Sequence, residues 1–213
     1  AEWSEKLSDE MYVGPTTATT PDGVRVLMMD VVYNGDPATG ERELAPLRAI
    51  GTPIADGVVV QDYTILQTNN DAAFGHGIRS YAKNGMVKQW SQELVDAMVE
   101  NDDPRIFIAN HVAGGAVKRV GELDTAFPHR NAEIMIVVVA GWMDAAQDDE
   151  LIAACRDYHQ AIEPHLGGYY GNIDFDHAAA KGNYGPAYER LSQIKGQYDP
   201  GNLFRLNSNI EPA

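Results

Sequence analysis

The sequence is poor in cysteine and in positive charge. Cys155 is the single cysteine among 213 residues, so an internal disulfide framework is excluded. It lies in ELIAACRDYHQAIEPHL, where helical spacing predicts a buried small hydrophobe rather than a nucleophile. Lys and Arg number 16 against 31 Asp and Glu, which gives a net charge of −15. Because that charge repels nucleic acid and anionic lipid, we expect neither nucleic acid nor a membrane as a partner.

Long hydrophobic runs are also lacking. The longest, IMIVVVAGWM at residues 134–143, has the length of a strand and not of a membrane span. No signal-peptide pattern is present, and the hydrophobic fraction of 44% is ordinary for a soluble protein. We expect a soluble, cytoplasmic protein. The acidic composition fits either adaptation to a salty cytoplasm or simple solubility, and solubility is the simpler explanation.

Motifs for metal, phosphate and serine chemistry do not occur in the sequence. The six histidines form no HExxH, no HxH and no pair with the cysteine, so we expect no metal site. Neither GxGxxG nor GxxxxGK[ST] is present, and no nucleophile-elbow motif is found. These patterns by themselves indicate a soluble α+β domain and no particular chemistry.

Local patterns predict several helices. Residues 38–51 have apolar residues at helical spacing and Gly51 as a stop signal. Residues 90–101 predict a second helix, with Ser91 as its N-cap and with one apolar face. That face is formed by Leu94, Val95 and Met98. A third helix is expected over residues 147–166.

Strand patterns occupy other parts of the chain. Residues 16–23 are the most loop-like stretch and lead into a strand at 24–35. Strands are expected at 105–112 and 116–121, with Gly114-Gly115 between them as a hairpin turn or bulge. Residues 133–142 predict a central strand that is apolar on both faces. Because helices and strands do not alternate strictly, we expect an α+β fold, an antiparallel β-sheet covered by helices on one face.

Two segments carry more specific patterns. In HVAGGAVKRVGELDTAFPHR, residues 111–130, the glycines permit a sharp reversal or the close approach of a planar ligand. His129-Arg130 could face a neighbouring domain, although a hairpin followed by a salt-bridged turn explains the same residues. The second segment, residues 181–210, predicts a helix that ends at YDPGN, followed by an extended tail.

Together these segments resemble the berberine bridge enzyme-like family of FAD-linked oxidases, which belongs to the vanillyl-alcohol oxidase flavoprotein fold. The family's tail reads YG-x-N-Y-x-R-L, then a Lys and YDP-x-N-x-F-R-x-N-x-N-I. The string GGA…RV…TAF-x-HR is matched between Gly114 and Arg130, and LAPLRAIGTPIAD at 44–56 is similar to the start of the family's substrate domain. The tail is matched at Tyr184, Gly185, Tyr188, Arg190, Leu191, Lys195, Tyr198, Asp199, Pro200, Asn202, Phe204, Arg205, Asn207, Asn209 and Ile210.

The resemblance implies an architecture and a cofactor, FAD. In the family, one domain binds FAD, and a second domain lays an antiparallel sheet over the isoalloxazine ring. A C-terminal segment then returns to the FAD domain. Residues 1–166 resemble the substrate-binding domain and residues 167–213 the returning segment. The FAD-binding domain would lie outside this chain, which is then either a piece of a longer protein or a natural chain that has lost the flavin half.

The resemblance also implies site residues. GGYYGNIDFD at 167–176 is similar to the family's Y-x-N-[YF]-x-D, with Tyr170 and Asn172 at the Tyr and Asn positions. Tyr170 is then a candidate catalytic base or substrate contact, although it could simply cap the sheet, and Tyr169 leaves the assignment open by one residue. The remaining implied residues are Asn172, Tyr184 and Asn209 for the cofactor and Tyr81, His111 and His129 for the substrate pocket.

The sequence departs from the family pattern at three places. Ala187 stands where the tail motif has Asn, and Ile173 stands where an aromatic residue follows Y-x-N. Plant members often have Glu or Gln on the strand after FPHR, but here only Glu133 begins that strand, with Val137 at the aligned position. A carboxylate base on this strand is therefore not expected.

Two functions are compatible with these patterns. The first is the substrate-binding and C-terminal part of an FAD-dependent oxidoreductase that oxidises a small organic substrate by hydride transfer to flavin. Its partners would be that substrate and an FAD-binding domain. The alternative is a stand-alone, non-catalytic module that binds a ligand or a partner and forms a homo-dimer through an exposed sheet face.

Overall fold

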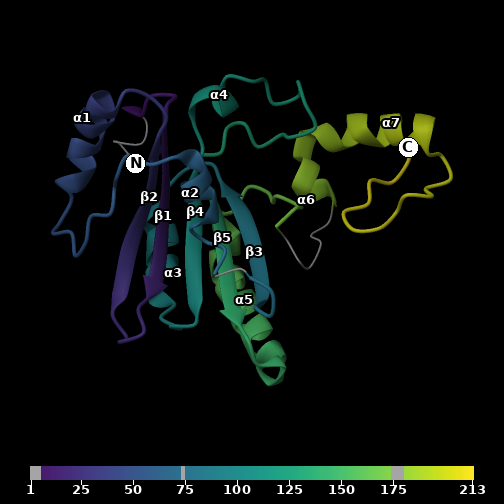
Figure 1. The fold of residues 1–213 in the computed structure, drawn as a ribbon. Helices are drawn as coiled ribbons and strands as arrows, with labels where there is room; N and C mark the ends of the chain where they lie inside the picture. Colours follow the sequence, from purple (N-terminus) through teal and green to yellow (C-terminus); the bar gives the residue numbers. More distant parts are fainter. Residues whose placement is uncertain (1–5, 73–74, 174–179) are drawn as a thin grey trace.

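The computed structural model describes residues 6–72, 75–173 and 180–213, and its centre is a five-stranded sheet (Figure 1). The strand order is β2-β1-β4-β5-β3, and every neighbouring pair is antiparallel. The expected α+β class and antiparallel sheet are thereby confirmed. The strands are β1 (Met11–Thr19), β2 (Arg25–Tyr33), β3 (Arg79–Val87), β4 (Ile106–Val112) and β5 (Ile134–Trp142).

Helices cover one face of this sheet. In Figure 1, α3 and α5 lie behind the strands, while α6, α7 and the C-terminal tail project to one side. Short 3₁₀ turns occupy residues 145–147, 163–165 and 185–187. The helices are α1 (Pro37–Arg48), α2 (Tyr63–Thr68), α3 (Gln92–Glu100), α4 (Gly115–Lys118), α5 (Asp148–Ile162), α6 (Ala180–Tyr184) and α7 (Tyr188–Tyr198).

The main core lies between α3, α5 and the sheet. Side chains alternate between the two faces of a strand, so Ile134, Ile136 and Val138 of β5 all point toward the helices. Leu94 and Ile162 meet them there, and both are fully buried. Each such side chain contributes about 1.5–3 kcal/mol relative to an exposed position. The face of the sheet toward α3 and α5 is therefore filled by core packing.

Helix α3 is fixed at both of its ends. The Ser91 hydroxyl accepts a hydrogen bond from the Leu94 amide at 3.1 Å, which confirms the expected N-cap. At the other end, the Arg25 guanidinium donates to the Asn101 carbonyl oxygen at 2.5 Å, and the Tyr158 hydroxyl donates to the Met98 carbonyl oxygen at 2.7 Å. These donors satisfy carbonyl groups that a helix C-terminus leaves unpaired.

Replacing Tyr158 by Phe should destabilise the fold by about 1–2 kcal/mol, because a buried hydrogen bond to a carbonyl is lost while the ring volume is kept. A urea unfolding curve measures this as a lower midpoint at unchanged slope. Tyr198 is 79% exposed and supplies the control, since its replacement by Phe should leave the curve unchanged. Equal curves for Tyr158→Phe and the control would contradict the assigned role.

Three local predictions were wrong. Residues 16–19 belong to β1 rather than to a loop. All nine residues of β1, these four included, pair with β2, and this pairing holds them in an extended form. Residues 116–121 form no strand: Gly115 has a φ of +51° and starts the short helix α4. Val95 is 38% exposed, so it does not share the buried face of α3.

Cys155 lies in the α5 core and is fully buried, which confirms the expected small hydrophobe. Burial raises the pKa of its thiol to about 12. A thiol with that pKa carries almost no thiolate near neutral pH, so it is a poor nucleophile. Among the described residues, no helix is both long and apolar enough to cross a membrane.

Candidate functional site

The sheet face opposite α3 and α5, called here the second face, is less uniformly packed. Its strip over β3 and β5 is apolar and buried, and it consists of Ala82, Val137 and Val139. Toward β4 the strip becomes half-buried at Ala109 and Met135. The strip at Ala82, Val137 and Val139 is thus covered by this chain, and the part of the second face left open to a ligand lies toward β4.

The chain after α5 is attached to the edge of the second face. The Met86 amide donates to the Gly168 carbonyl oxygen at 2.8 Å, and the Gly167 amide donates to the Met86 carbonyl oxygen at 2.7 Å. Gly85 makes room for this return, because a Cβ atom there would lie 2.2 Å from Cδ1 of Leu166. Residues 167–168 therefore continue the hydrogen bonding of the sheet beyond β3.

A buried asparagine fixes the backbone of Tyr170. Asn84 projects from β3 onto the second face and is fully buried. Its Nδ2 donates to the Tyr170 carbonyl oxygen at 2.9 Å, and its Oδ1 accepts from the Tyr170 amide at 2.7 Å. The Asn84 side chain thus makes the two hydrogen bonds with the Tyr170 backbone that a neighbouring strand would otherwise make. Sequence reasoning missed Asn84, because a polar residue in a strand resembles many surface positions.

The structure separates the two adjacent tyrosines. The Tyr170 hydroxyl accepts a hydrogen bond from Asn172 Nδ2 at 2.9 Å, and its ring meets the edge of Phe127 with centroids 6.2 Å apart. The Tyr169 hydroxyl instead donates to Glu163 Oε1 at 3.0 Å, and its ring lies 6.0 Å from that of His159. Tyr170 and Asn172 therefore belong together, and Tyr169 faces the end of α5.

His129 lies at the junction of two segments rather than on an open surface. It is buried, its Nε2–H donates to the Asn183 carbonyl oxygen at 3.0 Å, and its ring meets Phe127 edge-on at 5.6 Å. Gly168 approaches it closely, since a Cβ atom there would lie 2.3 Å from His129 Cε1. Burial lowers the pKa of His129 from its usual value, although hydrogen bonds to the backbone oppose this.

Arg130 closes the turn that precedes β5. Its guanidinium donates to the Phe127 carbonyl oxygen at 3.2 Å and to the Thr125 hydroxyl at 2.7 Å. It also lies 5.0 Å from the centre of the Phe127 ring. The His129-Arg130 pair is thus held by contacts within this chain.

His111 lies on the second face with a partner that sequence reasoning missed. The Tyr12 hydroxyl and His111 Nδ1 share a hydrogen bond of 2.7 Å between β1 and β4. Burial lowers the pKa of His111 and raises the pKa of Tyr12, while the charge of Asp30 raises both. The two residues are 99 positions apart in the chain, so only the pairing of the strands brings them together.

Tyr81 lies on the other face of the sheet. It is buried in the α5 core, where its hydroxyl accepts a hydrogen bond from Arg156 Nε at 3.0 Å. The structure therefore does not bring Tyr81 together with the other expected pocket residues. Its position in β3 explains this, because each neighbour along a strand points to the opposite face.

The C-terminal tail folds on α7 but leaves apolar side chains uncovered. The Asp199 carboxylate accepts hydrogen bonds from the amides of residues 203 and 204, which fixes the turn after α7. Leu203, Phe204 and Leu206 are 72%, 78% and 85% exposed. Within the described residues, the buried side-chain Oδ1 atoms of Asn202 and Asn209 have no hydrogen-bond partner. Tyr184, half-buried, ends α6 beside Asn183, which donates to the Ser208 hydroxyl at 2.8 Å.

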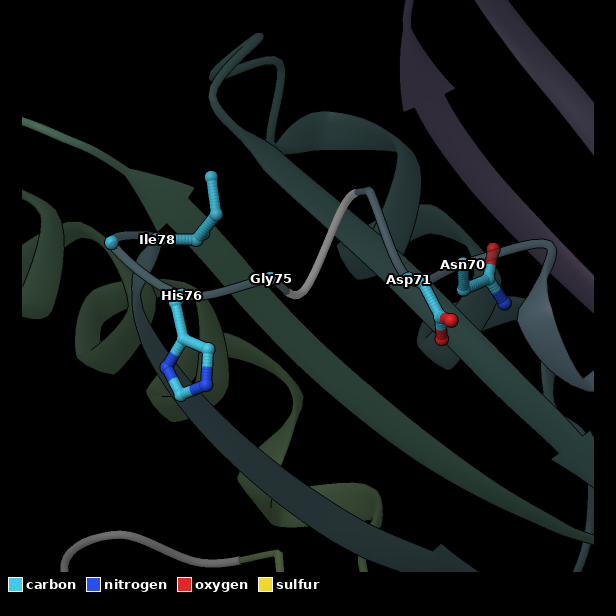
Figure 2. A pocket seen from close by; sticks show the side chains of 6 residues that line it. Asn70, Asp71, Gly75, His76 and Ile78 are labelled. Atoms are coloured by element: carbon cyan, nitrogen blue, oxygen red, sulfur yellow. The ribbon is translucent and has the colours of Figure 1, made fainter.

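Two surface hollows lie away from this site. One of about 540 Å³ is formed by the loop between α2 and β3, and Figure 2 shows His76 and Asp71 well apart along that loop. The other, of about 620 Å³, lies between β2, α1 and residues 58–66. Neither is lined by Tyr170, His111 or His129. Within the described parts of the chain, no group of three or more His, Cys, Asp or Glu side chains could hold a metal ion.

Comparisons with known proteins identify the C-terminal segment. Residues 168–211 match the family model described as "Berberine and berberine like". An FAD-linked oxidoreductase of Dictyostelium discoideum is 27% identical over 200 residues, which cover 91% of this chain and 43% of that protein. The (R)-6-hydroxynicotine oxidase of Paenarthrobacter nicotinovorans is 24% identical, with 97% and 48% covered. The chain thus spans less than half of the length of these relatives.

Solved structures share the fold. Berberine bridge enzyme from Eschscholzia californica superposes with a TM-score of 0.77 at 17% identity, covering 99% of this chain and 50% of that one. The 6-hydroxy-D-nicotine oxidase from Arthrobacter nicotinovorans superposes with a TM-score of 0.79 at 21% identity, covering 100% and 50%. The matched C-terminal segment and the curated relatives together show that the chain is similar to FAD-linked oxidoreductases of the berberine bridge enzyme-like family.

Proposed function

We propose that the chain is the substrate-binding and C-terminal part of an FAD-dependent oxidoreductase that oxidises a small organic substrate by hydride transfer to the flavin. Residues 1–166 would form the substrate-binding domain and residues 167–213 the segment that packs on an FAD-binding domain. The observation that carries the proposal is the position of Tyr170. The berberine-like segment returns along β3, and Asn84 holds Tyr170 there by two hydrogen bonds.

The residues present fit a flavin. The isoalloxazine ring is flat, mostly apolar and bears hydrogen-bonding groups at its edge, so it needs a smooth surface and a few polar contacts. The half-buried part of the second face, at Ala109 and Met135, would supply the surface, and the Asn209 Oδ1, which has no hydrogen-bond partner among the described residues, would supply an acceptor. Asn172, Tyr184 and Asn209 are the residues of this chain that would hold the cofactor. When bound, FAD supplies the acceptor for the hydride.

The residues of this chain would position the substrate and handle its proton. The Tyr170 oxygen accepts a hydrogen bond from Asn172, so its own O–H is directed elsewhere and can meet a substrate hydroxyl or amine. Oxidation of a hydroxyl or amine releases one proton with the hydride, and Tyr170 Oη would accept that proton while the phenol's own proton passes to water. No second general base is proposed, because the strand position where plant members have a carboxylate is Val137, in the apolar strip.

The exposed tail is the surface proposed to contact the FAD-binding domain. Leu203, Phe204 and Leu206 lie close together along the irregular segment after α7, and large apolar side chains grouped in this way are uncommon on a free surface. The alternative, a stand-alone module that pairs with a second copy, would cover the same kind of surface without a flavin.

The native gene product decides between these functions. We expect an intact mass about twice the 23.3 kDa of this chain, bound flavin, and loss of flavin colour on anaerobic addition of substrate. A native product of 23.3 kDa that binds no flavin would overturn the oxidoreductase proposal. In that case, a dimer in size-exclusion chromatography would support the stand-alone module.

A further inference from the structure

Building on the proposed function, we propose that Tyr12, His111 and Asp30 form a subsite that binds a hydroxyl group of the substrate and excludes anionic groups. The three side chains come from β1, β4 and β2, and the subsite lies on the second face at some distance from Tyr170. It would thus fix the far end of a substrate whose reacting end lies at Tyr170.

The pair is built into the sheet. Tyr12 belongs to β1, and its ring reaches the neighbouring strand to meet His111, with ring centroids 6.3 Å apart. It passes over Gly14, where an added Cβ atom would lie only 2.8 Å from the Tyr12 hydroxyl oxygen. Glycine inside a strand weakens the strand and often marks a close approach. Here Gly14 is what allows the phenol to lie across its own strand.

Asp30 adds a fixed negative charge beside this pair. It is the register partner of Gly14 on β2, and it therefore lies on the same face as Tyr12 and His111. Its charge acts on both rings, since it opposes the lowering of the His111 pKa and adds to the raising of the Tyr12 pKa. An anionic substrate group at this place would meet a like charge.

A neutral phenol and a neutral imidazole that share one proton leave one donor and one acceptor free. If the phenol donates to Nδ1, the free groups are Nε2–H and the phenol oxygen; with the other tautomer the two roles are exchanged. A hydroxyl group both donates and accepts, so it can bond to the free group of either member in either tautomer. Tyr12 is 37% exposed, so a ligand can reach the pair.

The surroundings define the rest of the ligand. His111 is the register partner of Met135, and Ala109 lies two residues earlier on the same face, so the hydroxyl site borders an apolar surface. Asn84, the anchor of Tyr170, lies two strands and two residues away, which corresponds to about 12 Å between backbone positions. The expected ligand is therefore a neutral molecule with an apolar body and a terminal hydroxyl, such as an arylalkanol.

The test is binding to the native gene product, followed by NMR of the histidine rings. 2-Phenylethanol should shift the His111 ring signals and bind about five- to tenfold more tightly than ethylbenzene, which lacks the hydroxyl. The double variant Tyr12→Phe/His111→Phe should abolish this preference. Phenylacetate should bind measurably only to Asp30→Asn. Ser80→Ala, on the same face at the edge of β3, is the control and should keep the wild-type preference.

Equal binding of the alcohol and the hydrocarbon by the wild-type protein would overturn the subsite, as would a preference that survives in the double variant Tyr12→Phe/His111→Phe. The readout does not depend on flavin, so the two proposals can fail separately. A protein that binds the alcohol through His111 but contains no flavin would keep the subsite and lose the oxidoreductase function. A flavin-bound protein with no alcohol preference would do the opposite.

Discussion

Replacing Tyr170 by Phe should lower the rate of substrate oxidation in the flavin-bound protein by about 100- to 10,000-fold, the range expected for loss of a positioned acid or base. The Phe ring keeps the edge contact with Phe127, and the two hydrogen bonds from Asn84 involve only the backbone of residue 170. The fold should therefore be unaffected. Stopped-flow measurement of flavin reduction under saturating substrate isolates this step.

The adjacent tyrosine provides a matched control. Tyr169→Phe removes a hydroxyl that donates to Glu163 at the end of α5, so it should leave flavin reduction unchanged. A large loss in both variants, or in Tyr169→Phe alone, would show that the site was assigned to the wrong tyrosine. A Tyr170→Phe protein with the wild-type rate but a raised KM would indicate a binding contact and no role in proton transfer.

Replacing Asn84 by Ala should destabilise the fold by about 2–4 kcal/mol, because two hydrogen bonds are lost and two backbone groups of Tyr170 lose their partners in a buried place. Nothing else on β3 can replace the side-chain amide without moving the strand. Urea unfolding gives the free-energy change. Flavin reduction should also slow, since the backbone that carries Tyr170 is released from the second face.

Asn110→Ala is the control for this effect. Asn110 is also buried in a strand, but its Nδ2 makes one hydrogen bond, to the Pro15 carbonyl oxygen at 2.9 Å, and its Oδ1 has no partner among the described residues. Its removal should cost about 1 kcal/mol. Equal losses for Asn84→Ala and Asn110→Ala would contradict the anchoring role of Asn84.

The residues that carry the family resemblance have structural roles that restrict which residue types can stand there. Asp199 binds the amides that follow α7, and Gly168 allows His129 to approach closely. Such positions tolerate few residue types, so they leave a pattern in the sequence. The resemblance therefore pointed to Tyr170 and Asn172, whereas the α+β class followed from the order of helices and strands.

The sequence by itself determined the elements whose signals are local. Ser91 caps α3, Gly51 has a φ of +67° just after α1, and the apolar run of β5 is buried on both faces. Each depends on residues within a few positions of one another. The helix-covered sheet followed from these elements because their apolar faces must be buried together.

Only the tertiary structure decided what lies on each face and beside each strand. β1 and β3 carry weak local signals and were missed, since pairing with neighbouring strands is what holds them. Alternate residues of β3 point to opposite faces, so Tyr81 lies in the α5 core while Asn84 lies on the second face. The Tyr12–His111 bond joins strands far apart in the chain. Long-range pairing sets these contacts, and neither composition nor spacing encodes it.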